Sequence, residues 1–273
     1  MTNTTKTTLR AAIFDWAGTT VDYGCIAPTV VFRAVFAARG VEISIEEARA
    51  PMGLEKRAHI RTITQMPDVT VRWADVHRRP PTEDDVLAMY ESFTPMQIGT
   101  LTDYADLIPG TIETLATCRA RGMRIGSTTG YSRAMMDVLQ PVAAQRGYAP
   151  DVCICPDEAP AGRPAPWMCM LNAMELNVYP MRAFVKVGDT LPDIAEGLNA
   201  GMWTVAVTQS GNEFGLSAGE IAALDRREVS ARNKAIEQRM RAAGAHYVIA
   251  TIADLPPILD AIDARLERGE QPS

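Results

Sequence analysis

The stretch Ala11-Ala12-Ile13-Phe14-Asp15-Trp16-Ala17-Gly18-Thr19-Thr20 decides the fold of this 273-residue chain. Its first four residues are apolar and predict a short buried strand, which a small turn with a glycine follows at once. Asp15 therefore stands at the end of the strand. There the N–H groups of the turn can cradle a phosphoryl group, and the carboxylate can attack phosphorus or bind a hard cation. An aspartate that only caps a turn fits the same stretch, so the other strand ends must decide between the two interpretations.

Short apolar runs like this one recur along the chain and alternate with helical patterns. Such alternation predicts an α/β fold with a doubly wound, mostly parallel sheet and helices on both faces, which binds ligands at the carboxyl ends of its strands. The strands are expected at residues 11–14, 123–127, 152–155, 183–187 and 203–207, with a sixth at 247–250. The helices between them are expected at 112–121, 133–145, 166–176 and 192–200.

The segment between the first two strands breaks this alternation. Helices are expected there at 30–39, 45–50, 54–64 and 84–93, and Thr82 is expected to cap the last of them. The pattern predicts a helical cap domain, residues 25–99, inserted into an α/β core domain made of residues 1–24 and 100–273. The cap would lie over the active edge of the sheet, on linkers near 21–24 and 100–109.

The second and third strands are followed by groups that suit a phosphoryl group. The second ends in Ser127-Thr128-Thr129-Gly130, where Ser127 or Thr129 can hydrogen-bond phosphoryl oxygens. After the third, Arg163 stands between Gly162 and Pro164, where a guanidinium can neutralise charge that develops on phosphorus. An ordinary arginine of a surface loop would also fit this position.

The fourth strand predicts a magnesium site. It ends in Val187-Gly188-Asp189-Thr190, and Asp193 comes four residues after Asp189. Carboxylate oxygens are ligands that Mg²⁺ prefers, so Asp189 is expected to bind the ion together with Asp15, with secondary support from Asp193. Asp193 has a competing role as a cap of the next helix.

In this order, the four strand ends resemble the four-motif series of the haloacid dehalogenase superfamily, and the helical insertion resembles its first type of cap. One position departs from that pattern. Phosphatases of the superfamily carry a second aspartate two residues after the nucleophile, and this residue protonates the leaving oxygen. Here that position is Ala17, which offers only its backbone carbonyl, to magnesium. The departure implies poor cleavage of ordinary phosphate esters.

A lysine of the insertion offers another way to expel a leaving group. Lys56 and His59 are three residues apart and share one helical face. A lysine whose pKa is lowered by burial or by nearby positive charge can form an imine with a carbonyl. Composition alone favours a solvated surface lysine at this position.

Longer stretches resemble one family of that superfamily, the phosphonoacetaldehyde hydrolases. They are Asp-Trp-Ala-Gly-Thr-Thr-Val-Asp-Tyr-Gly-Cys, Pro-Met-Gly-Leu-x-Lys, Gly-Ser-Thr-Thr-Gly-Tyr, Pro-Ala-Gly-Arg-Pro and Val-Gly-Asp-Thr. In that family the cap lysine forms a Schiff base with the substrate aldehyde, and the first aspartate attacks phosphorus. The departing group is then an enamine, which explains why no acid is needed at Ala17.

The resemblance implies a role for each site residue. Lys56 and Asp15 would be catalytic, and Asp15, Asp189 and the Ala17 carbonyl would hold Mg²⁺. The substrate would be bound by Ser127, Thr129, Arg163, His59 and Met52. Tyr131 and Cys25 lie near the motifs and are assigned to packing.

The resemblance also implies phosphonoacetaldehyde as substrate, its supply from 2-aminoethylphosphonate by an aminotransferase, and a homodimer. Two alternatives stay open. The first is a phosphatase or phosphomutase of the same superfamily acting on a small phosphate ester, which Ala17 disfavours. The second is a binding protein on the same scaffold, which would have no use for Lys56.

Composition narrows the class of protein. The net charge of −6 comes without a basic stripe, so we expect no nucleic-acid partner. No apolar run is long enough for a membrane span and no signal core is visible, so we expect no membrane association and a cytoplasmic location. The five cysteines are interpreted as reduced thiols. For the pair Cys153 and Cys155, strand packing is favoured over metal binding because no histidine is near in the sequence.

Overall fold

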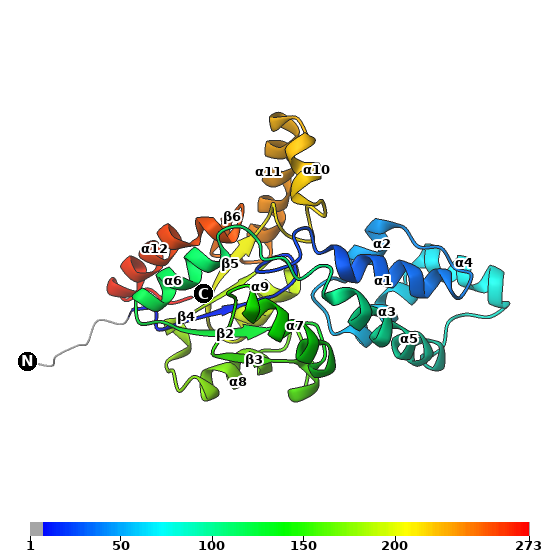
Figure 1. Ribbon diagram of the computed structural model, residues 1–273, viewed down its shortest axis with the longest axis horizontal. Coiled ribbons are helices and arrows are strands. Elements are labelled where there is room, and N and C mark those ends of the chain that lie inside the picture. The colour runs from blue at the N-terminus through cyan, green and yellow to red at the C-terminus, as the bar shows by residue number, and fades with distance from the viewer. Residues whose placement is uncertain (1–7, 273) are drawn as a thin grey trace, which may run out of the picture.

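The computed structural model describes residues 8–272 and consists of a parallel sheet with helices on both faces, beside a group of helices (Figure 1). Over those residues the sheet has six strands in the order β3-β2-β1-β4-β5-β6, and every pairing is parallel. The strands are β1 (Ala11–Phe14), β2 (Arg124–Thr128), β3 (Val152–Ile154), β4 (Phe184–Gly188), β5 (Trp203–Val207) and β6 (Tyr247–Ile249). The predicted fold class is confirmed, and each strand lies within one residue of its expected bounds.

Strand β1 is buried on both faces, which explains why its sequence is continuously apolar. Ala12 and Phe14 pack in one cluster with side chains of α6, α7 and α12, whereas Ala11 and Ile13 pack in another with side chains of α8. Burial of a side chain as large as Ile13 or Phe14 contributes about 1.5–3 kcal/mol. The core helices are α6 (Thr111–Ala120), α7 (Arg133–Gln145), α8 (Trp167–Glu175), α9 (Leu191–Asn199) and α12 (Leu255–Glu267), and short 3₁₀ turns occupy Pro156–Glu158, Met181–Ala183 and Ile252–Asp254.

The insertion after β1 forms a separate group of helices at the right of Figure 1. It contains α1 (Ile26–Ala37), α2 (Ile45–Arg49), α3 (Lys56–Thr64), α4 (Pro67–His77) and α5 (Glu83–Leu101). Helices α1 and α3 pack against α5, and the rings of Phe32 and Phe93 lie 4.5 Å apart at the centre. The predicted cap at Thr82 is confirmed, because its side chain accepts from the N–H of Asp85.

Helices α1, α4 and α5 of this group differ from the expectation. Helix α5 was expected to end at residue 93, but it continues through Pro95 to Leu101, and its buried face continues at Gln97 and Leu101. Helix α1 begins at Ile26 rather than at residue 30, because the carboxylate of Asp22 accepts hydrogen bonds from the N–H groups of Ile26 and Ala27. Proline usually interrupts a helix, so Pro28 argues against a start this early, although the first turn of a helix tolerates proline. Helix α4 was not predicted, since it buries only Val69 and Trp73 and so has a weak apolar pattern.

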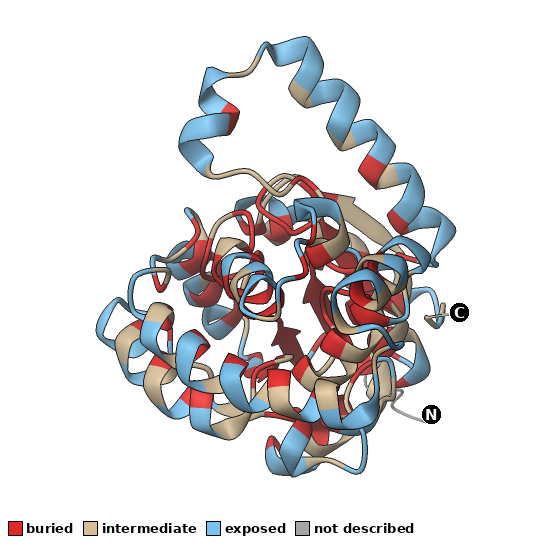
Figure 2. Cartoon of the chain, turned by 90° about the vertical axis from the view of Figure 1, so that its right-hand side faces the viewer, coloured by how far each residue is buried: buried red, intermediate tan, exposed pale blue. Residues whose placement is uncertain are grey.

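The sequence patterns also predict no helix or strand in the connection from β5 to β6. It contains α10 (Ala218–Ala223) and α11 (Arg226–Ala242), which project from the body of the protein (Figure 1). Helix α11 is mostly exposed and buries only Ile236 and Met240, so it lacks the apolar stripe that sequence patterns detect (Figure 2). Among the residues that the structure describes, none of the helices has the length and apolar character that crossing a bilayer requires.

Gly126 in β2 provides a test of how closely α8 packs on the sheet. A Cβ at this position would lie 2.3 Å from Oδ1 of Asn172 in α8. The Asn172 amide is held in place, because its Nδ2 donates to the carbonyls of Ser127 and Met168. We expect Gly126→Ala to lower the free energy of unfolding by about 1–3 kcal/mol through overpacking.

Urea unfolding followed by circular dichroism measures this change. Gly99→Ala is the matched control, because its Cβ would meet nothing within 4 Å and the residue lies inside α5. There the substitution should be neutral or stabilising by up to about 1 kcal/mol. A Gly126→Ala protein as stable as the wild type would contradict the close packing of α8 on β2.

Candidate active site

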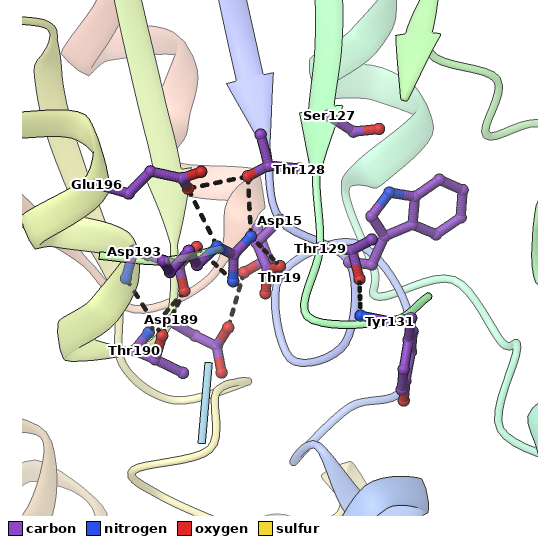
Figure 3. Close-up of polar contacts among 12 residues, drawn as sticks. Asp15, Thr19, Ser127, Thr128, Thr129, Tyr131, Asp189, Thr190, Asp193 and Glu196 are labelled. Atoms are coloured by element: carbon purple, nitrogen blue, oxygen red, sulfur yellow. Dashed lines mark hydrogen bonds and ion pairs between the residues drawn. The ribbon is translucent and has the colours of Figure 1, made fainter. Parts of the chain in front are cut away.

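The register of the sheet brings three strand ends together. Strand β1 lies between β2 and β4, and Phe14 is aligned with Ser127 on one side and Val187 on the other. The next residue, Asp15, donates its N–H to the carbonyl of Val187 at 2.9 Å. Asp15, Thr128 and Asp189 therefore emerge at the same carboxyl edge, where open α/β sheets bind ligands (Figure 3).

The turn after β1 is shaped by Gly18. Its φ is +85°, and a Cβ there would lie 2.3 Å from Oδ2 of Asp189. A glycine is thus required both for the left-handed conformation and for the approach of the Asp189 carboxylate. Thr19, in the same turn, donates its hydroxyl to Oδ1 of Asp189 at 3.0 Å. The turn consequently ties Asp15 and Asp189 into one unit.

Three buried carboxylates, those of Asp15, Asp189 and Asp193, lie within 4.8 Å of one another. Burial, together with repulsion from Asp15 and Asp193, raises the pKa of Asp189 well above its usual range. Asp189 accepts hydrogen bonds from Thr19 and from the N–H of Asn212, but no ion pair to it is recorded among the described residues. A divalent cation would relieve this repulsion, and the oxygen ligands suit Mg²⁺.

Asp193 differs from Asp189 because cations already surround it. Its Oδ1 contacts Lys186 Nζ at 2.7 Å and Arg163 Nη1 at 3.0 Å, and its Oδ2 accepts from the N–H and hydroxyl of Thr190. Burial would raise the pKa of Asp193, but Arg163 and Lys186 lower it below the usual value. Thr190 and Asp193 also form the capping box of α9, so the competing capping role is present.

Arg163 is buried and holds the carboxylates in place. Its Nη2 contacts Oδ1 of Asp15 at 2.6 Å and the hydroxyl of Thr128 at 2.9 Å, and its Nε donates to Glu196 at 3.0 Å. A guanidinium fixed by three carboxylates has little freedom to turn away. The loop arginine of the sequence is therefore in direct contact with Asp15.

Lys186 and Glu196 belong to this cluster but were not predicted from the sequence. Both are fully buried, with Lys186 Nζ 3.4 Å from Glu196 Oε2. The signal that could have found Lys186 is a charged residue inside the apolar strand Phe184–Gly188. The buried side chains of the cluster are four carboxylates (Asp15, Asp189, Asp193, Glu196) and two cations (Arg163, Lys186), which leave a formal charge of minus two when all are ionised. One Mg²⁺ would balance that charge.

The hydroxyls that follow β2 point to different places. Ser127 donates to the carbonyl of Val152 at 3.3 Å, towards the edge strand. Thr128 turns the other way and donates to Glu196 at 3.0 Å (Figure 3). Thr129 lines a small cavity next to Asp15, and its hydroxyl accepts a hydrogen bond from the N–H of Tyr131. Of the two expected phosphoryl ligands, Thr129 has the position to contact a ligand, whereas Ser127 is occupied elsewhere.

Lys56 is the first residue of α3 and is only 5% exposed, although it is a lysine. Its ammonium lies over the ring of Tyr131, 4.7 Å from the centroid, and 5.6 Å from that of Phe32. Burial, with a further contribution from Arg163, lowers the pKa of Lys56 to about 8, against the opposing influence of Cys25 and Asp15. Near pH 8 a large fraction of the side chain is therefore a neutral, nucleophilic amine.

His59 lies one turn further along α3 and is completely buried. Its Nε2 is 2.9 Å from the carbonyl of Ala48, and its ring stacks on Phe32 with the centroids 3.8 Å apart. Burial and the nearby Lys56 lower the pKa of His59 well below its usual value, so the ring is neutral. It lies behind Lys56 rather than among the residues that line the cavity.

Lys56 and Asp15 face one small cavity between the helical insertion and the sheet edge. Its walls also include Ala17, Met52, Thr129 and Arg163. Tyr131 and Cys25, which were assigned to packing, line it as well. The free volume is about 20 Å³, which is room for little more than one water molecule. A larger cavity of about 240 Å³, which Lys56 and Gly130 also line, adjoins it.

Comparisons of this chain with a protein-family model and with curated proteins agree on one family. A protein-family model for haloacid dehalogenase-like hydrolases matches residues 9–201. A curated phosphonoacetaldehyde hydrolase of Nitratidesulfovibrio vulgaris is 49% identical over 264 residues, which span 97% of this chain and 94% of that protein. A bifunctional phosphonoacetaldehyde hydrolase/aminoethylphosphonate transaminase of Clostridioides difficile is 48% identical over 255 residues, or 93% of this chain and 40% of that longer protein.

A solved structure agrees with these relatives. The crystal structure of a phosphonoacetaldehyde hydrolase-like protein from Oleispira antarctica superposes with a TM-score of 0.95 at 40% identity, and the match covers 97% of this chain and 96% of that one. The predicted resemblance is confirmed by sequence and by fold. The chain therefore belongs to the haloacid dehalogenase-like hydrolases and, within them, to the phosphonoacetaldehyde hydrolase family.

Proposed function

We propose that this protein hydrolyses the carbon–phosphorus bond of phosphonoacetaldehyde to acetaldehyde and phosphate. The observation that carries the proposal is the pairing of Lys56, a buried lysine with a lowered pKa, and Asp15 in the wall of one small cavity. An amine suits the aldehyde end of such a substrate, and a carboxylate next to a fixed arginine suits the phosphoryl end. The names of the relatives support the same substrate.

Ala17 explains why a phosphonate is favoured over a phosphate ester. An ester needs an acid to protonate the leaving oxygen, and Ala17 has no side chain that can serve as one. In a phosphonate the leaving atom is carbon, which needs an electron sink instead. An imine at the neighbouring carbon supplies that sink.

The first half of the reaction joins both ends of the substrate to the protein. The neutral amine of Lys56 attacks the aldehyde carbon, and loss of water leaves a protonated imine. A carboxylate oxygen of Asp15 then attacks phosphorus. The P–C bond breaks, and its electron pair moves into the imine to form an enamine. Arg163, which contacts Asp15 at 2.6 Å, neutralises charge on the transferring group.

The second half releases the products. A proton is added to the terminal carbon of the enamine, and water hydrolyses the resulting imine to acetaldehyde and free Lys56. A second water attacks the aspartyl phosphate and releases phosphate and Asp15. Imine formation releases one water and the two hydrolyses consume two, so the net reaction converts phosphonoacetaldehyde and one water into acetaldehyde and phosphate. His59 is proposed to move protons in the imine steps through Nδ1, which is buried and has no hydrogen-bond partner in the part of the chain that the structure describes, and Met52 to pack beside the amine.

The metal site is proposed to hold Mg²⁺ through Asp15, Asp189 and the Ala17 carbonyl, with Asp193 in a supporting position. When bound, the ion would stabilise negative charge on the phosphoryl oxygens. The excess of buried carboxylates and the raised pKa of Asp189 support this assignment. Thr129, rather than Ser127, is proposed as the hydroxyl that binds the phosphoryl group, because it lines the cavity.

Residues 25–99 are proposed to move as a cap over a core of residues 1–24 and 100–273. The small free volume of the cavity supports this motion, since Lys56 comes from the insertion and Asp15 from the sheet edge. A transaminase is the class of enzyme that would make the aldehyde from 2-aminoethylphosphonate, and the fused relative of Clostridioides difficile supports that supply. The homodimer and the cytoplasmic location stay predictions.

Product analysis is the first test. We expect the purified protein to release equimolar phosphate and acetaldehyde from phosphonoacetaldehyde in the presence of Mg²⁺, and to lose that activity in excess chelator because the phosphoryl charge is then unbalanced. Enzymatic phosphate release and acetaldehyde reduction can be followed in parallel. Faster hydrolysis of an aryl phosphate than of phosphonoacetaldehyde would instead favour a phosphatase.

The pH dependence tests the role of Lys56. Its amine attacks only when neutral, and its pKa is about 8, so kcat/KM should rise with pH through a limb at or below about pH 8. Bound Mg²⁺ could only lower this limb, because it adds positive charge. An ordinary lysine would place the limb near pH 10, and such a limb would argue against attack by Lys56.

A further inference from the structure

Arg49, the last residue of α2, reaches from the helical insertion into the core. Its Nη1 donates to the carbonyl of Gly24 at 2.8 Å, and to the carbonyl and side-chain oxygen of Asn212 at 3.2 Å each. Asn212 follows β5 and returns a hydrogen bond from Nδ2 to the carbonyl of Arg49 at 3.3 Å. One cap arginine therefore holds both the first linker and a core loop.

Asn212 also contacts the proposed metal site. Its backbone N–H donates to Oδ2 of Asp189 at 2.7 Å. The side chain of Asn212 thus contacts the cap, and its backbone contacts Asp189, which has no ion-pair partner among the described residues. Gly24 is joined to the same loop, because its N–H donates to the carbonyl of Ser210, whose hydroxyl donates to the carbonyl of Gly18.

In the core loop, residues 208–215, two glycines allow Arg49 and Asp189 to approach the backbone closely. A Cβ on Gly215 would lie 2.9 Å from Cζ of Arg49, and a Cβ on Gly211 would lie 2.5 Å from Cβ of Asp189. Residues with side chains at these two positions would push away the guanidinium or the carboxylate. The path from Arg49 to Asp189 is therefore a continuous set of close contacts rather than a single surface hydrogen bond.

We propose that Arg49 and Asn212 form a latch that couples closure of the cap to Mg²⁺ binding at Asp189. With the cap closed, Arg49 holds Asn212, and the N–H of Asn212 keeps Asp189 oriented towards the ion. Linkage requires the converse as well: an ion that fixes Asp189 stabilises the closed cap. The proposal rests on the proposed function only for the identity of the ion. Arg49 and Asn212 are positioning residues, since neither lines the cavity.

Three variants isolate the latch. Arg49→Met removes the donor, and Asn212→Ala removes the side chain but keeps the backbone N–H that binds Asp189. The double variant tests whether the two act together. Arg72→Met is the matched control, because Arg72 is also a cap arginine and its ion pair, to Glu47 at 2.6 Å, stays within the cap. Circular dichroism establishes that each variant is folded.

Titration calorimetry with Mg²⁺ alone measures the affinity. We expect Arg49→Met and Asn212→Ala each to weaken binding at least about fivefold, the lower end of ordinary coupling between two sites. The double variant should lose less affinity than the product of the two single losses, because the two side chains belong to one connection, of which each single variant leaves one hydrogen bond to a backbone carbonyl. Arg72→Met should bind as the wild type does. Unchanged affinity in the single variants, or losses that multiply in the double variant, would overturn the latch.

Hydrogen exchange followed by mass spectrometry measures the conformational side without any substrate. In the wild type, Mg²⁺ should slow exchange both in residues 208–215 and in the cap segment 49–56. In Arg49→Met, saturating Mg²⁺ should still protect residues 208–215 but no longer protect the cap segment. Equal protection of the cap segment in Arg49→Met and the wild type would overturn the coupling.

These outcomes are separable from those of the substrate assay. A protein that shows the exchange pattern but does not cleave phosphonoacetaldehyde would keep the latch and lose the proposed function. A protein that cleaves it while Arg49→Met behaves as the wild type would keep the function and lose the latch. Absence of Mg²⁺ binding in the wild type would overturn both.

Discussion

The burial of four carboxylates at one edge of the sheet is the constraint on which the rest of the structure depends. A buried carboxylate without a partner is costly, so each one requires a cation or several hydrogen-bond donors. Arg163 contacts Asp15, Asp193 and Glu196, and Lys186 contacts Asp193 and Glu196. Among residues 8–272, Asp189 receives only neutral donors. This uneven distribution of charge supports the proposed site for one divalent cation next to Asp15. These side chains lie close together because β1 lies between β2 and β4, so that the carboxyl ends of the three strands meet.

The helical insertion buries a basic group rather than acidic ones. It buries a single amine, Lys56, against the rings of Tyr131 and Phe32 and gives it no carboxylate in direct contact among the described residues, so its neutral form becomes accessible near pH 8. The core thus offers groups that tolerate a phosphoryl dianion, while the insertion offers a nucleophile for a carbonyl. The proposed substrate carries both of these groups, two bonds apart. Ala17 is consistent with this division, since a carbon leaving group has no use for an acid at that position.

Much of this arrangement could be predicted from the sequence, because strands buried on both faces are continuous apolar runs and their ends carry the chemistry. Asp15, Arg163 and Asp189 were recognised in this way. The sequence could not show which hydroxyl after β2 lines the cavity. Adjacent residues of a strand point to opposite faces, and the expected bounds of β2 were wrong by one residue. Lys186 was missed although it is a charged residue inside an apolar strand, and Glu196 was missed because only its contacts with Arg163 and Lys186 show its role. Helices α4 and α11 were missed because they bury few side chains.

The central claim is that Lys56 forms a covalent imine with the substrate, and reductive trapping tests it most directly. The chain has four lysines, Lys6, Lys56, Lys186 and Lys234, so the site of trapping can be assigned without ambiguity. Borohydride added together with phosphonoacetaldehyde should inactivate the protein irreversibly, and peptide mass mapping should find a reduced two-carbon adduct on Lys56. Lys56→Arg keeps the charge but cannot form this imine, and it should be neither trapped nor active. An adduct on another lysine, or normal turnover by Lys56→Arg, would contradict the imine mechanism.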